Sequence, residues 1–209
     1  MSLRPLLALV PAVLLLGGCG SLLGPKESPT IYAPTPVPQA DAAWPRVAWN
    51  LATTRPDAPR LLDSARMAVR PVPGELQVYK GSIWASAPPD LLEATVLRVL
   101  EDSGKIPAAA RQGSGMDAPY RLVMDIRHFE ADYAGSALPA AVIEVNAKLI
   151  HVVDQAVAGN RTFRHAQPAN GTDPRVVADA FSLALAHIGR DIAGWTLVTG
   201  QAHEGAPHR

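Results

Sequence analysis

The chain has 209 residues, and its 19 lysines and arginines balance its 19 aspartates and glutamates, so the formal net charge at pH 7 is zero. No basic excess favours nucleic acid as a partner, and no acidic run forms a solvating tail. Cys19 is the only cysteine, which excludes a disulfide within one copy, so the apolar core must hold the fold by itself.

The first residues have the layout of a bacterial lipoprotein signal. Arg4 supplies a small positive region, residues 6–16 are mostly apolar, and residues 16–19 read Leu-Gly-Gly-Cys. The apolar run is shorter than the roughly 20 residues that span a bilayer. The pattern resembles the lipobox, which implies that residues 1–18 are removed as a signal peptide and that Cys19 is acylated. The alternative is a chance cysteine in an ordinary secretory signal or a short membrane helix.

The residues after Cys19 indicate which membrane the protein reaches and how the domain is connected to its anchor. The residues that follow Cys19 are Gly20 and Ser21, not an aspartate. In similar lipoproteins, the absence of an aspartate at this place favours export to the outer membrane. We expect residues 19–30 to form a lipidated tether. Eight prolines between residues 25 and 60 favour an extended chain, and the alternation over residues 46–51 predicts a first strand within it.

Alternating and helical patterns predict one domain over residues 31–199. Further strands are expected over residues 66–70, 75–79, 121–127, 143–149 and 161–165. Residues 71–74 predict a turn and residues 80–82 a bend. Phe129 breaks the strand alternation, which indicates a bulge or bend.

Two helices complete the prediction. Residues 90–101 carry an apolar face and are followed by Gly104, a helix stop. Asp173 is a predicted cap for the longest amphipathic pattern, residues 176–195. Residues 108–119 indicate a flexible loop, and residues 200–209 a disordered tail.

The sequence offers no recognisable catalytic or metal motif. The histidines are scattered, with no pair at ligand spacing on one element: His128, His151, His165, His187, and, in the tail, His203 and His208. Asp125 is the best acidic candidate, but nothing near it in sequence supplies a base or nucleophile. We therefore predict no catalytic residues, no metal and no cofactor. Cys19, as a lipidation site, is the only assigned site residue, and ligand-binding residues stay unassigned.

Taken in order, these features resemble the ABC-type transport auxiliary lipoprotein family, from about residue 30 to residue 198. The matching features are Cys19, residues 31–32, residues 67–72 (Met-Ala-Val-Arg-Pro-Val), Trp84 before the helix at 90–101, residues 127–130 (Arg-His-Phe-Glu), residues 147–150 (Ala-Lys-Leu-Ile) and the helix at 176–195. Two features depart from the family pattern: only Tyr32 remains of a tyrosine-rich start, and residues 72–79 lack the usual proline-tyrosine-leucine form.

The resemblance implies an α+β fold, with a small, mainly antiparallel sheet and two amphipathic helices packed on one face. It also implies a lipid-anchored protein on the periplasmic face of the outer membrane, beside an MCE-type substrate-binding protein, a permease and an ATPase that move lipid between membranes. Such a component docks or forms a conduit; self-association is left open. A lipoprotein that activates cell-wall synthesis or envelope assembly is the alternative, and a periplasmic hydrolase is a third hypothesis.

Overall fold

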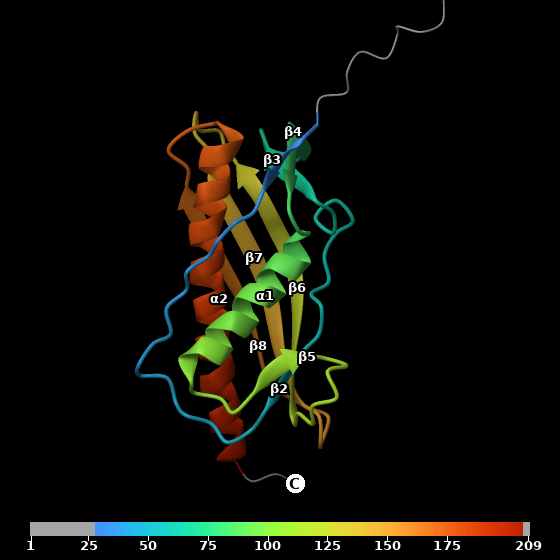
Figure 1. Ribbon diagram of the computed structural model, residues 1–209, viewed down its shortest axis with the longest axis vertical. Helices are drawn as coiled ribbons and strands as arrows, with labels where there is room; N and C mark the ends of the chain where they lie inside the picture. The colour runs from blue at the N-terminus through green and yellow to red at the C-terminus, as the bar shows by residue number, and fades with distance from the viewer. Residues whose placement is uncertain (1–27, 207–209) are drawn as a thin grey trace, which may run out of the picture.

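The computed structural model describes residues 28–206, so the predicted signal peptide and Cys19 lie outside the described residues. In chain order the elements are β1 (Thr30–Tyr32), β2 (Leu51–Thr53), β3 (Arg66–Arg70), β4 (Gln77–Trp84), α1 (Pro88–Ser103), β5 (Ala109–Arg111), β6 (Tyr120–Asp132), β7 (Ala140–His151), β8 (Ala156–Pro168) and α2 (Pro174–Glu204). Both helices cover one face of the sheet, as predicted (Figure 1). No helix among the described residues is long and apolar enough to cross a membrane.

The sheet is mixed, so the prediction of a mainly antiparallel sheet holds only in part. Strands β6, β7 and β8 form a long antiparallel meander, and β3 pairs antiparallel with β4. In contrast, β1 pairs parallel with β4, and β2 pairs parallel with both β5 and β6. Strand β3 is also parallel to β6. The 13-residue β6 is long enough to pair with β2 near its start, at Tyr120, and with β3 near its end, at Ala131.

Several local predictions differ from the structure in their extent. The expected loop over residues 108–119 contains β5, which pairs with β2. Strand β4 continues through the predicted bend at residues 80–82, where Gly81 has a positive φ of 67°. The predicted irregularity near Phe129 is confirmed as a register shift between Ile126 and His128.

Both helices include the predicted ranges and extend beyond them at each end. Helix α1 ends at Gly104, which adopts the left-handed conformation, and the Asp173 side chain caps α2 by accepting a hydrogen bond from the Arg175 N–H. Helix α2 continues to Glu204, so the disorder predicted for residues 200–209 is wrong for residues 200–204. Residues 207–209 lie outside the described residues.

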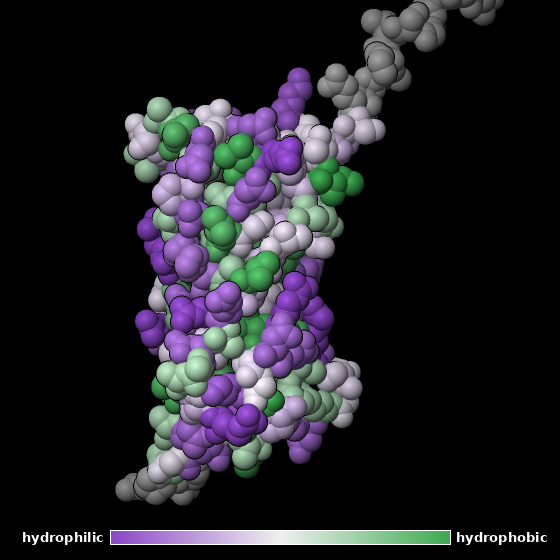
Figure 2. All heavy atoms as spheres, turned by 60° about the vertical axis from the view of Figure 1, so that its left-hand side comes forward, coloured by the Kyte–Doolittle hydropathy of each residue, from purple (hydrophilic) through white to green (hydrophobic). Residues whose placement is uncertain are grey.

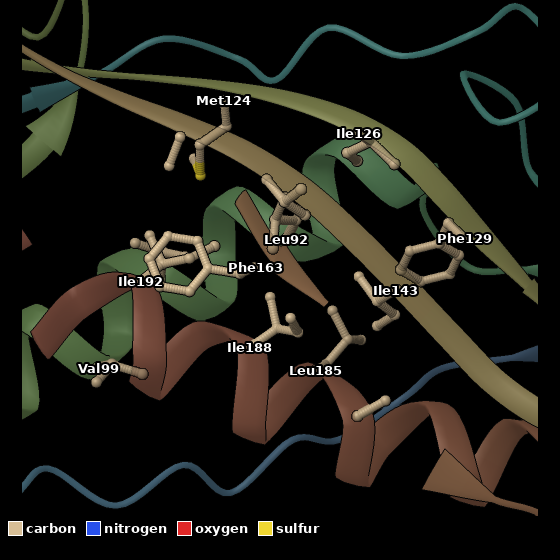
Figure 3. Close-up of a cluster of buried hydrophobic side chains, with 14 of the residues drawn as sticks. Leu92, Val99, Met124, Ile126, Phe129, Ile143, Phe163, Leu185, Ile188 and Ile192 are labelled. Carbon is tan, nitrogen blue, oxygen red and sulfur yellow. The ribbon is translucent and has the colours of Figure 1, made fainter. Parts of the chain in front are cut away.

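The core lies between the sheet and the two helices (Figure 3). Three large aromatic side chains, Trp84, Phe129 and Phe181, are almost completely buried there. The Phe129 and Phe181 rings stack with their centroids 4.8 Å apart, and Trp84 meets both rings edge-on. Such aromatic contacts add to the stabilisation from apolar burial alone. This cluster therefore fastens α2 to β4 and β6.

An N-terminal strap, residues 33–50, runs along α2 in the same direction as the helix (Figure 1). The Thr35 N–H donates to Ser182 Oγ near the start of the helix. Further along, Trp44 packs on Gly194 and Trp49 packs on Gly200, since a Cβ at either glycine would overlap the indole. The two glycines therefore leave α2 flat enough to accept the tryptophans.

The strand predicted over residues 46–51 is wrong in its position, because β2 begins only at Leu51. The predicted alternation of buried side chains is nevertheless present, since Val47, Trp49 and Leu51 are all buried. The pattern has more than one source, because Trp49 packs on Gly200 of α2 whereas Leu51 belongs to the paired strand β2.

We expect Gly200→Ala to destabilise the protein by about 1–3 kcal/mol through overpacking. In an open helix the same change would stabilise by about 1 kcal/mol, but here the new methyl group would lie 2.3 Å from Trp49 Cζ2. Urea denaturation followed by tryptophan fluorescence measures the effect. Gly205→Ala is the control, because a Cβ there makes only ordinary contacts. Equal stability changes in the two variants would contradict this account of the strap.

Candidate functional site

One end of the domain exposes several apolar side chains. We call it the hairpin end and define it by the β3–β4 hairpin (residues 70–78) and the β6–β7 loop (residues 133–139). The two connections are neighbours, because β3 and β6 pair up to Arg70 and Asp132. The exposed apolar residues there are Val72, Leu76, Val78 and Leu138, which are between 37% and 50% exposed. Clustered exposed apolar residues are typical of an interaction surface.

The chain enters the domain at this same end. Strand β1 runs parallel to β4, with Thr30 opposite Ser82 and Tyr32 opposite Trp84. Because β4 leads away from the hairpin, residues 28 and 29 lie on the side of β1 that faces the hairpin end (Figure 1). The described part of the chain therefore begins on the side of the domain that carries the hairpin end.

The buried carboxylate of Glu130 holds together the two strands next to the hairpin end. Glu130 is 1% exposed, and its Oε1 accepts two hydrogen bonds from Arg70, at 2.8 and 3.1 Å. The same oxygen lies 2.6 Å from His128 Nδ1, and Oε2 accepts from the Phe129 N–H at 2.7 Å. Charge-assisted hydrogen bonds of this kind are among the stronger ones. They join β3 to β6 and fix the hairpin relative to the sheet.

A groove lies between the strap, α2 and β8. It contains a cavity of about 400 Å³ lined by Trp44, Arg161, Phe163 and Trp195, among others. A neighbouring cavity of about 510 Å³ shares Arg190 with it, and both are bordered by Asp41, the ion-pair partner of Arg190. Hydrophobic side chains are interspersed with hydrophilic ones on this side of the molecule (Figure 2).

Asp125, the acidic candidate from the sequence, lies exposed on β6. Its carboxylate is 4.0 Å from the Arg127 guanidinium, and its backbone forms a bridge with Asp57. An exposed pair of this kind is typical of a solvated strand face and contributes little to stability.

The fold pairs histidines that look scattered in the sequence. The rings of His165 on β8 and His187 on α2 stack with centroids 4.4 Å apart. His151 at the end of β7 and His203 near the end of α2 have centroids 5.0 Å apart, next to the buried Tyr120. Sequence spacing could not reveal either pair, because each joins a strand to the helix that crosses it.

Hydrogen bonding and burial shift the pKa values of Tyr120 and Asp154, which lie beside His151 and His203. Burial, and then the hydrogen bond to Glu204, raises the pKa of Tyr120 above its ordinary value, so its hydroxyl stays protonated. The pKa of Asp154 is lowered, first by the Ala156 N–H and also by His151 and His203, so its carboxylate stays ionised near neutral pH.

A family model for the ABC-type transport auxiliary lipoprotein component matches residues 30–193. The chain belongs to this family. The match begins at β1 and ends within α2, so it includes the strap, the hairpin end and most of the core. Members of this family are auxiliary lipoproteins of ABC-type transport systems.

Two solved structures are similar to this chain. A crystal structure of a protein from Xanthomonas campestris is 50% identical, covers 85% of this chain and 99% of its own, and superimposes with a TM-score of 0.82. An uncharacterised protein structure with 15% identity and a TM-score of 0.62, covering 80% of this chain and 97% of its own, shares the fold.

A curated relative, an uncharacterised protein of Bradyrhizobium diazoefficiens, is 26% identical over 154 residues. The aligned region covers 71% of this chain but only 40% of that relative. The chain therefore spans less than half the length of the curated relative that it matches.

Proposed function

We propose that this protein is a lipid-anchored, non-enzymatic component of an MCE-type ABC transport system, acting as a dock or conduit at the periplasmic face of the outer membrane. The family match over residues 30–193 carries the proposal. The lipobox-like residues 16–19 supply the expected anchor at Cys19, and Gly20 and Ser21 favour the outer membrane. The transported molecules would be phospholipids or other apolar compounds.

A short connection to the anchor would set the orientation of the domain. Only ten residues lie between Cys19 and Thr30, which are 11 positions apart, and an extended chain gains at most about 3.6 Å per position, so the reach is about 40 Å. The chain enters at the hairpin end, which would therefore face the anchoring membrane. The exposed apolar residues of that end, such as Val72 and Leu138, would then lie close to the lipid surface.

This orientation predicts different lipid contact at the two ends of the domain. A bimane probe on Val72→Cys should be quenched by spin-labelled lipids in the bilayer that holds the anchor. The same probe on Val153→Cys, in the β7–β8 turn at the opposite end, should not be quenched. Val153 is a matched control because it is also exposed, at 78% against 49%. Acylation of Cys19 would leave each introduced cysteine as the only free thiol. Equal quenching, or quenching only at position 153, would contradict the orientation.

The non-enzymatic role agrees with how the charged groups are used. At the hairpin end, Arg70 and His128 both contact the buried carboxylate of Glu130, and the Arg70 contact joins two strands. Near strands β2 and β5, the buried Glu93 of α1 accepts hydrogen bonds from Thr53 and Arg111. In both places the ionisable side chains fasten the fold together, which supports a structural rather than a catalytic role.

Co-purification tests the proposed function. The acylated protein, cross-linked in intact cells and then purified, should bring down an MCE-type substrate-binding protein with its permease and ATPase. A Cys19→Ser form should lose this association, because it would not reach the same membrane. A strain lacking the gene should show altered outer-membrane lipid composition. No association together with normal lipid composition would refute the proposal.

A further inference from the structure

Three potential metal ligands converge at the end of the domain opposite the hairpin end. His151 is the last residue of β7, Asp154 lies in the β7–β8 turn, and His203 lies on the last turn of α2. One ligand atom from each residue lies within 4.8 Å of the other two. His151 is buried, His203 is half-buried and Asp154 is exposed, so the cluster opens to solvent on one side.

Hydrogen bonds already orient the three side chains. His151 Nδ1 lies 2.9 Å from Asp154 Oδ1, which also accepts from the Ala156 N–H at 3.0 Å. The hydroxyl of the fully buried Tyr120 lies 2.9 Å from His203 Nδ1 and 2.8 Å from Glu204 Oε1. Metal-binding histidines are usually held by such outer partners, which fix the ring orientation.

We propose that His151, Asp154 and His203 bind a divalent transition metal ion, with Zn²⁺ the best match. Two imidazoles and a carboxylate form a donor set that suits Zn²⁺, and water or the neighbouring Glu204 carboxylate would fill a fourth position. Tyr120, through its contact with His203 Nδ1, would direct the other ring nitrogen of His203 to the metal.

The required adjustment is small. Ligand atoms around a tetrahedral Zn²⁺ with bonds of about 2.0–2.1 Å lie about 3.4 Å apart. The His151 and Asp154 atoms, at 2.9 Å, are already near this separation, and the ion would take the place of the proton between them. The His203 ligand atom lies within 4.8 Å of the other two, so it would need to approach them by at most about 1.4 Å, which its half-buried position near the end of α2 permits.

The consequence of metal binding would be a cross-link between the end of α2 and the β7–β8 turn. Asp154 in the turn and His203 in the helix are 49 positions apart in sequence. Tyr120 already contacts both Glu204 and the Gly200 carbonyl. A metal ion would add a second connection at the same place and would stabilise the last turn of α2.

Metal titration of the full acylated chain in detergent, after treatment with EDTA, tests the proposal. We expect Zn²⁺ at a hundred times its Kd to raise Tm by about 5–10 °C. Co²⁺ should bind with one-to-one stoichiometry and give the visible absorption of a four-coordinate ion. Both signals should be lost in His203→Ala and in Asp154→Asn. They should persist in His128→Ala, which removes a histidine at the hairpin end.

The comparison is made within each variant, as the difference in Tm with Zn²⁺ and with EDTA, so a change in basal stability does not obscure it. Asp154→Asn alters an exposed side chain of the same size and keeps the test readable if His203→Ala folds poorly. No rise in Tm and no Co²⁺ absorption in the unaltered protein would overturn the proposal. Retention of both signals in the two ligand variants would overturn it as well.

Discussion

Phe181→Ala is expected to lower the free energy of unfolding by about 3–5 kcal/mol, the range found when a large buried aromatic side chain is truncated. Phe181 is completely buried, stacks on Phe129 and meets Trp84 edge-on. Its removal leaves a cavity where α2 contacts two strands, and the rigid rings around it would not fill that space. Equilibrium urea denaturation followed by circular dichroism measures the change.

Leu183→Ala provides the matched control for this substitution. Leu183 lies two residues further along the same helix and is 53% exposed, so its truncation should change the stability by no more than about 0.5 kcal/mol. A comparable loss of stability in both variants would mean that the aromatic cluster is not a main source of core stability. Little loss in Phe181→Ala would have the same meaning.

Cys19→Ser should abolish the incorporation of fatty acid completely and, under the function proposed above, should remove this protein from the outer-membrane fraction. Serine has no thiol to accept the diacylglyceryl group, so cleavage before residue 19 should also stop and a longer precursor should accumulate. Metabolic labelling with an alkyne fatty acid, followed by membrane fractionation, measures both effects.

Ser21→Ala is the control for the anchor, because it alters a residue two positions away and keeps the cysteine. It should be labelled and localised like the unaltered protein. Fatty-acid labelling of Cys19→Ser would show that the anchor lies elsewhere. Unchanged outer-membrane localisation of Cys19→Ser would show that the protein is held there by other contacts.

Local periodicity was sufficient to predict the elements that carry the core. Strands β6 and β7 alternate apolar and polar residues over long stretches, and α2 repeats apolar residues at helical spacing, so burial alone specifies them. The proline and glycine signals around α1 also located its ends. Even the register shift near Phe129 left a visible break in the alternation.

Long-range pairing could not be predicted in the same way. Strands β2 and β5 have only three residues each, and their parallel pairing depends on segments far apart in the chain. The sequence shows that Trp49 is apolar but not that Gly200 will accept it. The helical end of α2 was also missed, because contacts with Tyr120 stabilise a segment whose composition indicates disorder.

The candidate site was predicted only in part for the same reason. Residues 127–130 were recognised as a family feature, but the burial of Glu130 between Arg70 and His128 required the fold. His151 and His203 are 52 positions apart, and only the crossing of α2 over the sheet brings them together. Exposed apolar residues of the hairpin end carry no sequence signal that separates them from core residues.

The intact mass of the mature protein, extracted from membranes, tests most directly whether this family member is an anchored lipoprotein. We predict a chain that begins at Cys19 and carries a diacylglyceryl group on the sulfur and a further acyl chain on the amino group. A mature protein with a free Cys19 thiol, or one that begins at another residue, would contradict the account.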